Sequence, residues 1–193
     1  MRSLADRKRQ LVRDELSEAA LKLLAYQGFE ETTIEQIAAA AGVSKRTFFR
    51  YFAAKEDVLI EMLSELADAI RAGLATRPAS ESPAEALRAV FQIPIDEFTT
   101  GHPDPAKSLR LARLVLGTPA VRARYLDRQH QLRTEVAGLL AARTGEPYRA
   151  SVQAAIGFAA YEAAVERWAA ADGAEDLGEL VDQAFAQASL ALA

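Results

Sequence analysis

The stretch AGVSKRTFFRYFAAKED, residues 41–57, contains a short segment with aromatic and cationic side chains on opposite sides of a helix. Phe48 and Phe52 are four residues apart and therefore share one face. Arg46 and Arg50 are also four apart and share the far side. This arrangement predicts a helix that packs through its phenylalanines and offers its arginines to an anion. The alternative is a solvated face whose charges serve only solubility.

A second short helix precedes this one. The tetrapeptide TIEQ, which begins at Thr33, is a capping box that opens a helix over residues 33–41. Gly42 ends that helix, because glycine accepts the left-handed conformation found after helix ends. Ser44 is the N-cap of the next helix, over residues 45–52. Two short helices joined by a tight turn indicate a helix-turn-helix, whose second helix enters the major groove of DNA.

The charge distribution also favours an anionic partner at the N-terminal end. The chain has 193 residues and a formal net charge of −4. Residues 1–57 hold ten Lys/Arg and nine Asp/Glu, a net charge of +1, whereas residues 58–193 hold thirteen and eighteen, a net charge of −5. An anion-binding surface is therefore expected to be local and near the N-terminus.

The rest of the chain has helical periodicity and nothing that indicates a strand, so we predict an all-α fold of about nine helices. Proline stands where the periodicity restarts, at Pro83, Pro105, Pro119 and Pro147, and is well tolerated at the first helical position. Pro94 is expected to kink one helix. The helices are expected at residues 7–27, 33–41, 45–52, 55–76, 83–100, 105–116, 119–143, 147–171 and 175–191.

The segment TTIEQIAAAAGVSKRTFFRYFAAKEDVL resembles the N-terminal DNA-binding region of TetR-family transcriptional repressors. The resemblance covers about residues 10–60, and it implies that Phe48 and Phe52 are core residues. The DNA-facing set that it implies is Ser44, Lys45, Arg46, Thr47, Phe49, Arg50 and Tyr51, with Thr33 and Lys55 as phosphate clamps.

The resemblance further implies two domains: a three-helix DNA-binding domain over residues 1–54, and a ligand-binding and dimerisation domain over residues 55–193. The stretches LGTPAVRARYLDRQHQL and ERWAAADG are similar to an actinobacterial subgroup with an acyl-CoA-like ligand domain. These features imply a repressor that binds palindromic double-stranded operator DNA as a homodimer and is released by a small apolar or amphipathic effector. We expect the helices at 147–171 and 175–191, including Ala184, to form the dimer interface.

Apolar residues from five expected helices indicate a ligand pocket, although each of them could equally fill the core. Arg110 and Arg113 are expected at its rim, where guanidinium groups would meet the phosphates of an acyl-CoA. Glu162 is the expected polar group inside. The expected apolar walls are Met62, Leu66, Phe91, Leu111, Leu114, Tyr125, Phe158 and Tyr161.

Other chemistry finds little support in the sequence. The chain has no cysteine, and neither His102 nor His130 has a second histidine near it, so we expect no metal, catalytic residue or cofactor. No stretch approaches the roughly 18 apolar residues that span a bilayer, and no secretory signal is evident. We therefore expect a cytoplasmic protein that is not an enzyme. The rival interpretation is a helical small-molecule-binding protein or enzyme without DNA-binding activity.

Overall fold

The structure is a computed structural model that describes residues 4–100 and 105–191, and these residues form ten helices and no strand. The all-α fold predicted from the sequence is confirmed. No helix in the described ranges is long and apolar enough to cross a membrane. The helices are α1 (Leu4–Gln27), α2 (Ile34–Ala40), α3 (Lys45–Tyr51), α4 (Glu56–Ala75), α5 (Pro83–Val90), α6 (Gln92–Thr99), α7 (Pro105–Gly117), α8 (Pro119–Thr144), α9 (Pro147–Ala170) and α10 (Leu177–Ala191).

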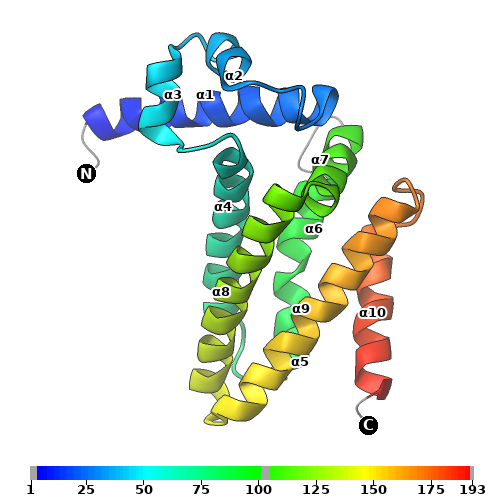
Figure 1. Cartoon of the computed structure of the whole chain (residues 1–193). Helices are drawn as coiled ribbons and strands as arrows, with labels where there is room; N and C mark the ends of the chain where they lie inside the picture. The colour runs from blue at the N-terminus through cyan, green and yellow to red at the C-terminus, as the bar shows by residue number, and fades with distance from the viewer. Residues whose placement is uncertain (1–3, 101–104, 192–193) are drawn as a thin grey trace.

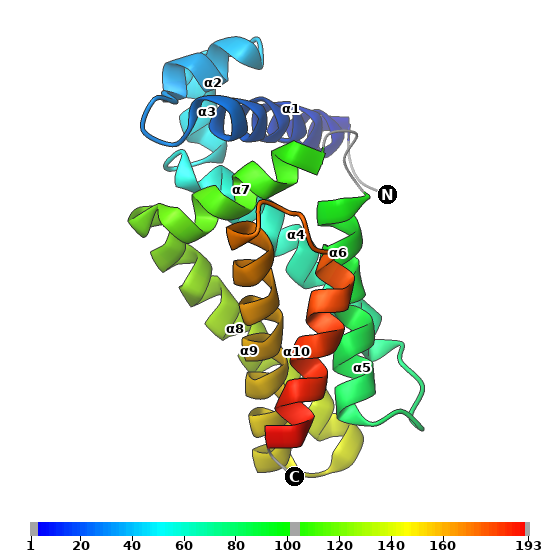
Figure 2. The same ribbon diagram turned by 90° about the vertical axis from the view of Figure 1, so that its right-hand side faces the viewer.

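The helices are arranged as a small cap on an elongated bundle (Figure 1). Helices α1, α2 and α3 form the cap, and α1 lies across the upper end of α4. Helix α7 reaches the underside of the cap, and the long helices α8 and α9 run down the bundle. Figure 2 shows α9 and α10 along one face of the bundle. The upper end of α8 shares a core with the cap, through Val121 and Tyr125.

Proline sets the start of four helices. Helices α5, α7, α8 and α9 begin at Pro83, Pro105, Pro119 and Pro147, as the sequence predicted. The fixed backbone angle of proline suits the first turn, where its missing N–H would have no partner in any case. The starts of these four helices are therefore set largely by the backbone properties of their own prolines.

The single helix expected over residues 83–100 is two helices, α5 and α6, separated at Phe91. Pro94 lies in the first turn of α6, one turn after the break. Because proline has no N–H, it cannot bond the carbonyl of Val90, and the chain turns before the proline instead. A break between two helices therefore replaces the expected kink. Phe91 lies at this break, and only 1% of its surface is exposed.

Two clusters of buried apolar residues form the interior. The upper cluster joins the cap, through residues such as Leu16 and Phe48, to Val58 of α4, Val115 of α7 and Val121 of α8. The lower cluster lies among the bundle helices α4 to α10. The domain boundary expected between residues 54 and 55 stays a prediction, and the upper core takes side chains from both sides of it.

Candidate nucleic-acid interface and ligand pocket

The turn between α2 and α3 is fixed by hydrogen bonds at both helix ends. The Thr33 hydroxyl accepts from the Gln36 amide at 3.2 Å, and the Gln36 side chain accepts from the Thr33 amide at 2.8 Å. After α2, Gly42 has φ +66°, and the Val43 amide donates to the Ala38 carbonyl at 2.9 Å. These bonds satisfy groups that a helix end leaves unpaired, so the turn is held in one geometry.

Helix α3 is anchored by its aromatic face. Ser44 caps it, since its hydroxyl accepts from the Thr47 amide at 3.1 Å. Phe48 is completely buried, and its ring centroid lies 5.6 Å from that of Phe52. Phe49 packs edge-on against Phe48 and is 48% exposed. The remaining face of α3 is therefore free to meet solvent or a partner.

That remaining face carries three cations. Arg46 is exposed and has no hydrogen bond or ion pair with any residue that the structure describes. Arg50 is exposed too, with its guanidinium 5.1 Å from the centroid of the Tyr51 ring. Lys45 forms an ion pair with Glu35. Arginine groups held in water keep their donors available for phosphate or guanine.

Glu35 is a member of this surface that the sequence analysis did not single out. Its carboxylate, at the start of α2, reaches the Lys45 ammonium across the turn. The hydrogen bond from Lys45 holds the pKa of the Glu35 carboxyl below its ordinary value. The sequence did contain a signal for this ion pair, because an acid in the first turn of α2 is ten residues from a cation in the first turn of α3. Any phosphate that binds Lys45 must compete with this carboxylate.

Thr33 and Lys55, the expected phosphate clamps, have different surroundings. Thr33 is exposed at the N-terminus of α2. The Lys55 ammonium donates to the carbonyls of Phe29 at 2.5 Å and Thr32 at 3.0 Å, and it lies 4.0 Å from the Phe29 ring centroid. An ammonium group has three donors, so one remains for a phosphate. Both clamp roles stay predictions, and Lys55 also ties the loop after α1 to the start of α4.

The start of α4 is linked to the bundle by Asp57. One oxygen of its carboxylate accepts from the amides of Ala53 at 3.0 Å and Ala54 at 2.8 Å. The other oxygen pairs with Arg124 of α8. The protein's own carboxylate thus occupies amides directly after α3, and it connects this segment to α8.

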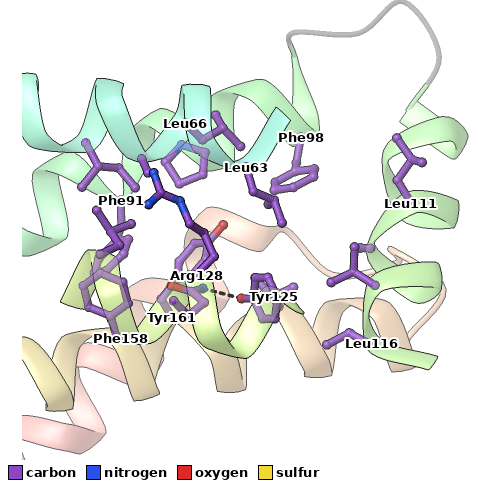
Figure 3. Close-up of a pocket in the computed structure, with 18 residues that line it drawn as sticks. Leu63, Leu66, Phe91, Phe98, Leu111, Leu116, Tyr125, Arg128, Phe158 and Tyr161 are labelled. Carbon is purple, nitrogen blue, oxygen red and sulfur yellow. Dashed lines mark hydrogen bonds between the residues drawn. The ribbon is translucent and has the colours of Figure 1, made fainter. Parts of the chain in front are cut away.

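A mostly apolar cavity of about 70 Å³ lies between the two cores (Figure 3). Leu111 and Tyr125 belong to the upper core and also line the cavity, whereas Phe91 and Tyr161 belong to the lower one. The rings of Phe91 and Tyr161 stack with centroids 4.8 Å apart. The cavity has room for a few water molecules as it stands. The expected pocket residues that line it are Leu66, Phe91, Leu111, Tyr125, Phe158 and Tyr161.

Two further expected wall residues are not placed in this cavity. Met62 falls within α4, but its side chain lies outside the described part of the chain. Leu114 packs against the upper core instead. Arg110, expected at the rim, is exposed and lies 4.7 Å from the centroid of the Tyr26 ring on α1. Arg110 therefore joins α7 to the cap in this structure.

The two remaining expected residues make contacts elsewhere. Arg113 donates to the Ala169 carbonyl at 2.9 and 2.7 Å and pairs with Asp172, so it ties α7 to the end of α9. Glu162 pairs with Arg122 of α8 at 3.2 Å. Neither is among the residues that line the cavity.

The cavity has polar members that the sequence analysis did not identify, Arg128 and Gln129 of α8. The Gln129 amide donates to the Tyr125 hydroxyl. Burial raises the pKa of Tyr125 to about 12, and the bond from Gln129 offsets part of that rise. Burial likewise raises the pKa of Tyr161. The walls therefore strongly disfavour a phenolate, as expected where water is largely excluded.

Two families match the chain, and together they cover most of it. Residues 16–62 match bacterial regulatory proteins of the tetR family, and residues 81–192 match the MftR C-terminal domain. The chain belongs to the TetR family. Its N-terminal end therefore carries the helix-turn-helix of this family, and the relatives that it matches are named as transcriptional regulators rather than enzymes.

Curated TetR-family relatives resemble much of this chain. The transcriptional regulator TcmR of Streptomyces glaucescens is 40% identical over 145 residues, which are 74% of this chain and 64% of TcmR. The regulator MftR of Mycobacterium tuberculosis, named for mycofactocin biosynthesis, is 27% identical over 150 residues, 74% of this chain and 71% of MftR. The chain thus spans under two thirds of the length of TcmR.

A solved repressor structure has the same fold over nearly the whole chain. FadR of Thermus thermophilus, a TetR-family transcriptional repressor in complex with lauroyl-CoA, has a TM-score of 0.58 and 28% identity. The match covers 91% of this chain and 92% of that protein. The likeness therefore includes the bundle as well as the helix-turn-helix.

Proposed function

We propose that this chain is a ligand-responsive repressor that binds a palindromic operator as a homodimer and is released by a small apolar or amphipathic effector. The observation that carries the proposal is the two-sided character of α3. Phe48 is completely buried on one side, while Arg46 and Arg50 are exposed on the other. We place this activity in the cytoplasm, where bacterial DNA lies.

The surface of α3 suits double-stranded DNA. Arg46 and Arg50 are one helical turn apart, a spacing that lets one reach a base edge while the other meets a phosphate. Thr33 at the start of α2 is exposed and well placed for a neighbouring phosphate. Ser44, Lys45, Thr47, Phe49 and Tyr51 complete the proposed contact surface, and Lys55 retains one donor for it.

A second copy of the chain is the proposed partner of α9. Tyr148 is 85% exposed and Val152 is 41% exposed, and the exposed Ala159 and Ala163 lie at helical spacing further along. This apolar face fits a two-fold interface, in which the same surface of each copy is covered. Two recognition helices must lie about 34–36 Å apart to enter successive major grooves.

The dimer is tested at Val152. Val152→Glu places a charge on the exposed face of α9, whereas Ala184 is half-buried and packed against the chain's own core. We expect sedimentation to give a dimer for the unaltered protein and a monomer with weak DNA binding for the variant. A monomeric unaltered protein at micromolar concentration would contradict the homodimer.

The cavity between the two cores is the proposed effector site. A molecule that enlarges it would push on Tyr125, which packs in the upper core, and Arg124 beside it pairs with Asp57 at the start of α4. A ligand shifts DNA affinity only if it binds one spacing of the recognition helices better than the other. Because the FadR structure holds lauroyl-CoA, an acyl-CoA is one candidate effector.

The experiment that tests the repressor is selection of bound duplexes from a random DNA pool. We expect enrichment of a palindrome with half-sites about one helical turn apart. Acyl-CoA thioesters are then titrated against the complex, and release should grow with chain length, since each buried methylene adds about 0.8 kcal/mol. A pool that shows no enriched sequence would overturn the DNA-binding function.

A further inference from the structure

Arg128 is a half-buried cation that lines the cavity and has no acidic partner among the described residues. Its side chain extends from α8 toward the side of the cavity that Leu66 occupies (Figure 3). Its Nε atom is buried and has no hydrogen-bond partner among the described residues. Nη1 lies 3.3 Å from the side-chain oxygen of Gln131, which is a neutral and distant acceptor. The guanidinium is therefore partly exposed at the side of Gln131, whereas its buried Nε donor has no partner.

No counter-charge accompanies it. Among the described residues that line the cavity, none is Asp or Glu. The two preceding arginines of α8 differ, since Arg122 pairs with Glu162 and Glu166, and Arg124 pairs with Asp57. Charges that leave water are normally paired, because an isolated buried charge is costly. Of these three arginines, Arg128 has no acidic partner among the described residues, and its buried Nε is available to an anion in the cavity.

A second donor faces the same space. The Tyr125 hydroxyl accepts from the Gln129 amide, so its own hydrogen remains free to donate. Tyr125 and Arg128 are three residues apart on α8 and both line the cavity (Figure 3). The wall around them is formed by large apolar side chains, including the rings of Phe91, Phe98 and Phe158. The cavity wall therefore offers donors from Arg128 and Tyr125, which lie on one helix, and is otherwise mainly apolar.

We propose that the effector is an apolar molecule that carries an oxyanion, and that this oxyanion binds Arg128 with help from the Tyr125 hydroxyl. The inference rests on the proposed function, because it names the chemistry of that regulator's ligand. Two sources share this chemistry: the carboxylate of a fatty or aromatic acid, and a phosphate of an acyl-CoA. Arginine pairs well with both, through parallel hydrogen bonds.

A matched pair of fluorescent probes tests the oxyanion. Anilinonaphthalenesulfonate and phenylnaphthylamine have the same ring system, but only the first carries an anion. We expect the sulfonate to bind the unaltered protein more tightly, and Arg128→Met to weaken it roughly tenfold to a hundredfold, as loss of a charge-assisted hydrogen bond predicts. Phenylnaphthylamine should bind both proteins alike. Arg128→Lys, which keeps the charge, should give an intermediate affinity for the sulfonate.

Controls separate this inference from misfolding. Arg133→Met, on the same helix but not lining the cavity, should leave both probes unchanged. Circular dichroism and DNA binding without probe should match the unaltered protein in every variant. An equal loss of both probes in Arg128→Met, or no loss of the sulfonate, overturns the oxyanion site while DNA binding stands. Failure of the unaltered protein to bind DNA would instead refute the proposed function.

Competition against the bound sulfonate distinguishes the sources of the anion. Decanoate, methyl decanoate and decanoyl-CoA share one chain and differ in the charge at its end. Displacement by decanoate but not by its ester assigns the site to a carboxylate, and displacement by decanoyl-CoA alone assigns it to a phosphate. Both patterns require Arg128 and should disappear in Arg128→Met. If the ester competes as well as the two anions, or if none of the probes binds, the proposal is wrong.

Discussion

Arg46 on α3 and Arg128 on α8 carry the same charge in opposite surroundings. Arg46 lies in water on a surface supported from beneath by Phe48. Arg128 lines an apolar cavity, and its Nε is buried without a partner. The first charge costs little to maintain and suits binding through long-range attraction and flexible contacts. The second leaves one buried donor without a partner, which an anion in the cavity would satisfy.

This difference suits the two surfaces to the two proposed kinds of recognition. A charge in water is screened and suits a polyanion that offers many phosphates. A charge in a cavity is scarcely screened, so a single oxyanion of the right size is enough. Helix α8 connects the two regions, because its Arg124 pairs with Asp57 near α3. Arg128, one turn further along α8, lines the cavity.

The largest expected effect is on stability, and it comes from removing Phe48, the buried ring that anchors α3. Phe48→Ala should lower the free energy of unfolding by about 3–5 kcal/mol, because it removes a completely buried ring from the upper core. Phe49→Ala is the matched control: its ring is 48% exposed, so stability should change far less while DNA affinity falls. Urea denaturation of both variants measures this. Equal losses would mean that α3 is not anchored by one face.

The next largest effect is on the pH dependence of stability, and it tests whether water is excluded from the Tyr125 hydroxyl. Burial raises the pKa of Tyr125 from 10.0 to about 12, so its neutral form is favoured by folding. The stabilisation is complete below pH 10 and is lost as the pH rises from 10 toward 12, by at most about 2–3 kcal/mol. Tyr125→Phe should show a smaller fall over this window in denaturation experiments. An identical pH dependence would show that water reaches this hydroxyl.

Removing an exposed arginine should affect binding rather than folding. Arg46→Ala is expected to weaken operator binding by about 1–3 kcal/mol and to relax preference at one base position if it contacts a base. Its stability should change by only about 0.5 kcal/mol, because the side chain is exposed. Fluorescence anisotropy and a thermal melt measure the two quantities. A large drop in melting temperature with unchanged affinity would contradict the role of α3.

The smallest effect has the opposite sign. Arg128→Met should raise the free energy of unfolding by about 1 kcal/mol in the absence of ligand, because a buried Nε donor without a partner is replaced by an apolar side chain. Most substitutions destabilise, so a gain is diagnostic. Arg128→Lys should show no such gain. A loss above about 1 kcal/mol in Arg128→Met would show that the guanidinium is well accommodated without a ligand.

The helix-turn-helix was predictable because its determinants are local. The capping box at Thr33, the left-handed Gly42 and the Ser44 cap lie within a dozen residues, and each acts on the backbone beside it. The spacing of Phe48 and Phe52 then identifies the buried face of α3. Proline starts such as Pro119 follow the same logic, since the proline ring acts on its own first turn.

Only the tertiary structure decided which polar groups meet each other. Helix α8 carries charge on several sides, so nothing in its local pattern distinguishes Arg128 in the cavity from Arg124, which pairs with Asp57. Likewise Lys55 bonds the carbonyls of Phe29 and Thr32, which are distant in sequence. Helical periodicity tells which residues share a face, whereas packing against other helices sets what lies opposite. The exposed cationic face of α3 could therefore be predicted from the sequence by itself, and the chemistry of the cavity could not.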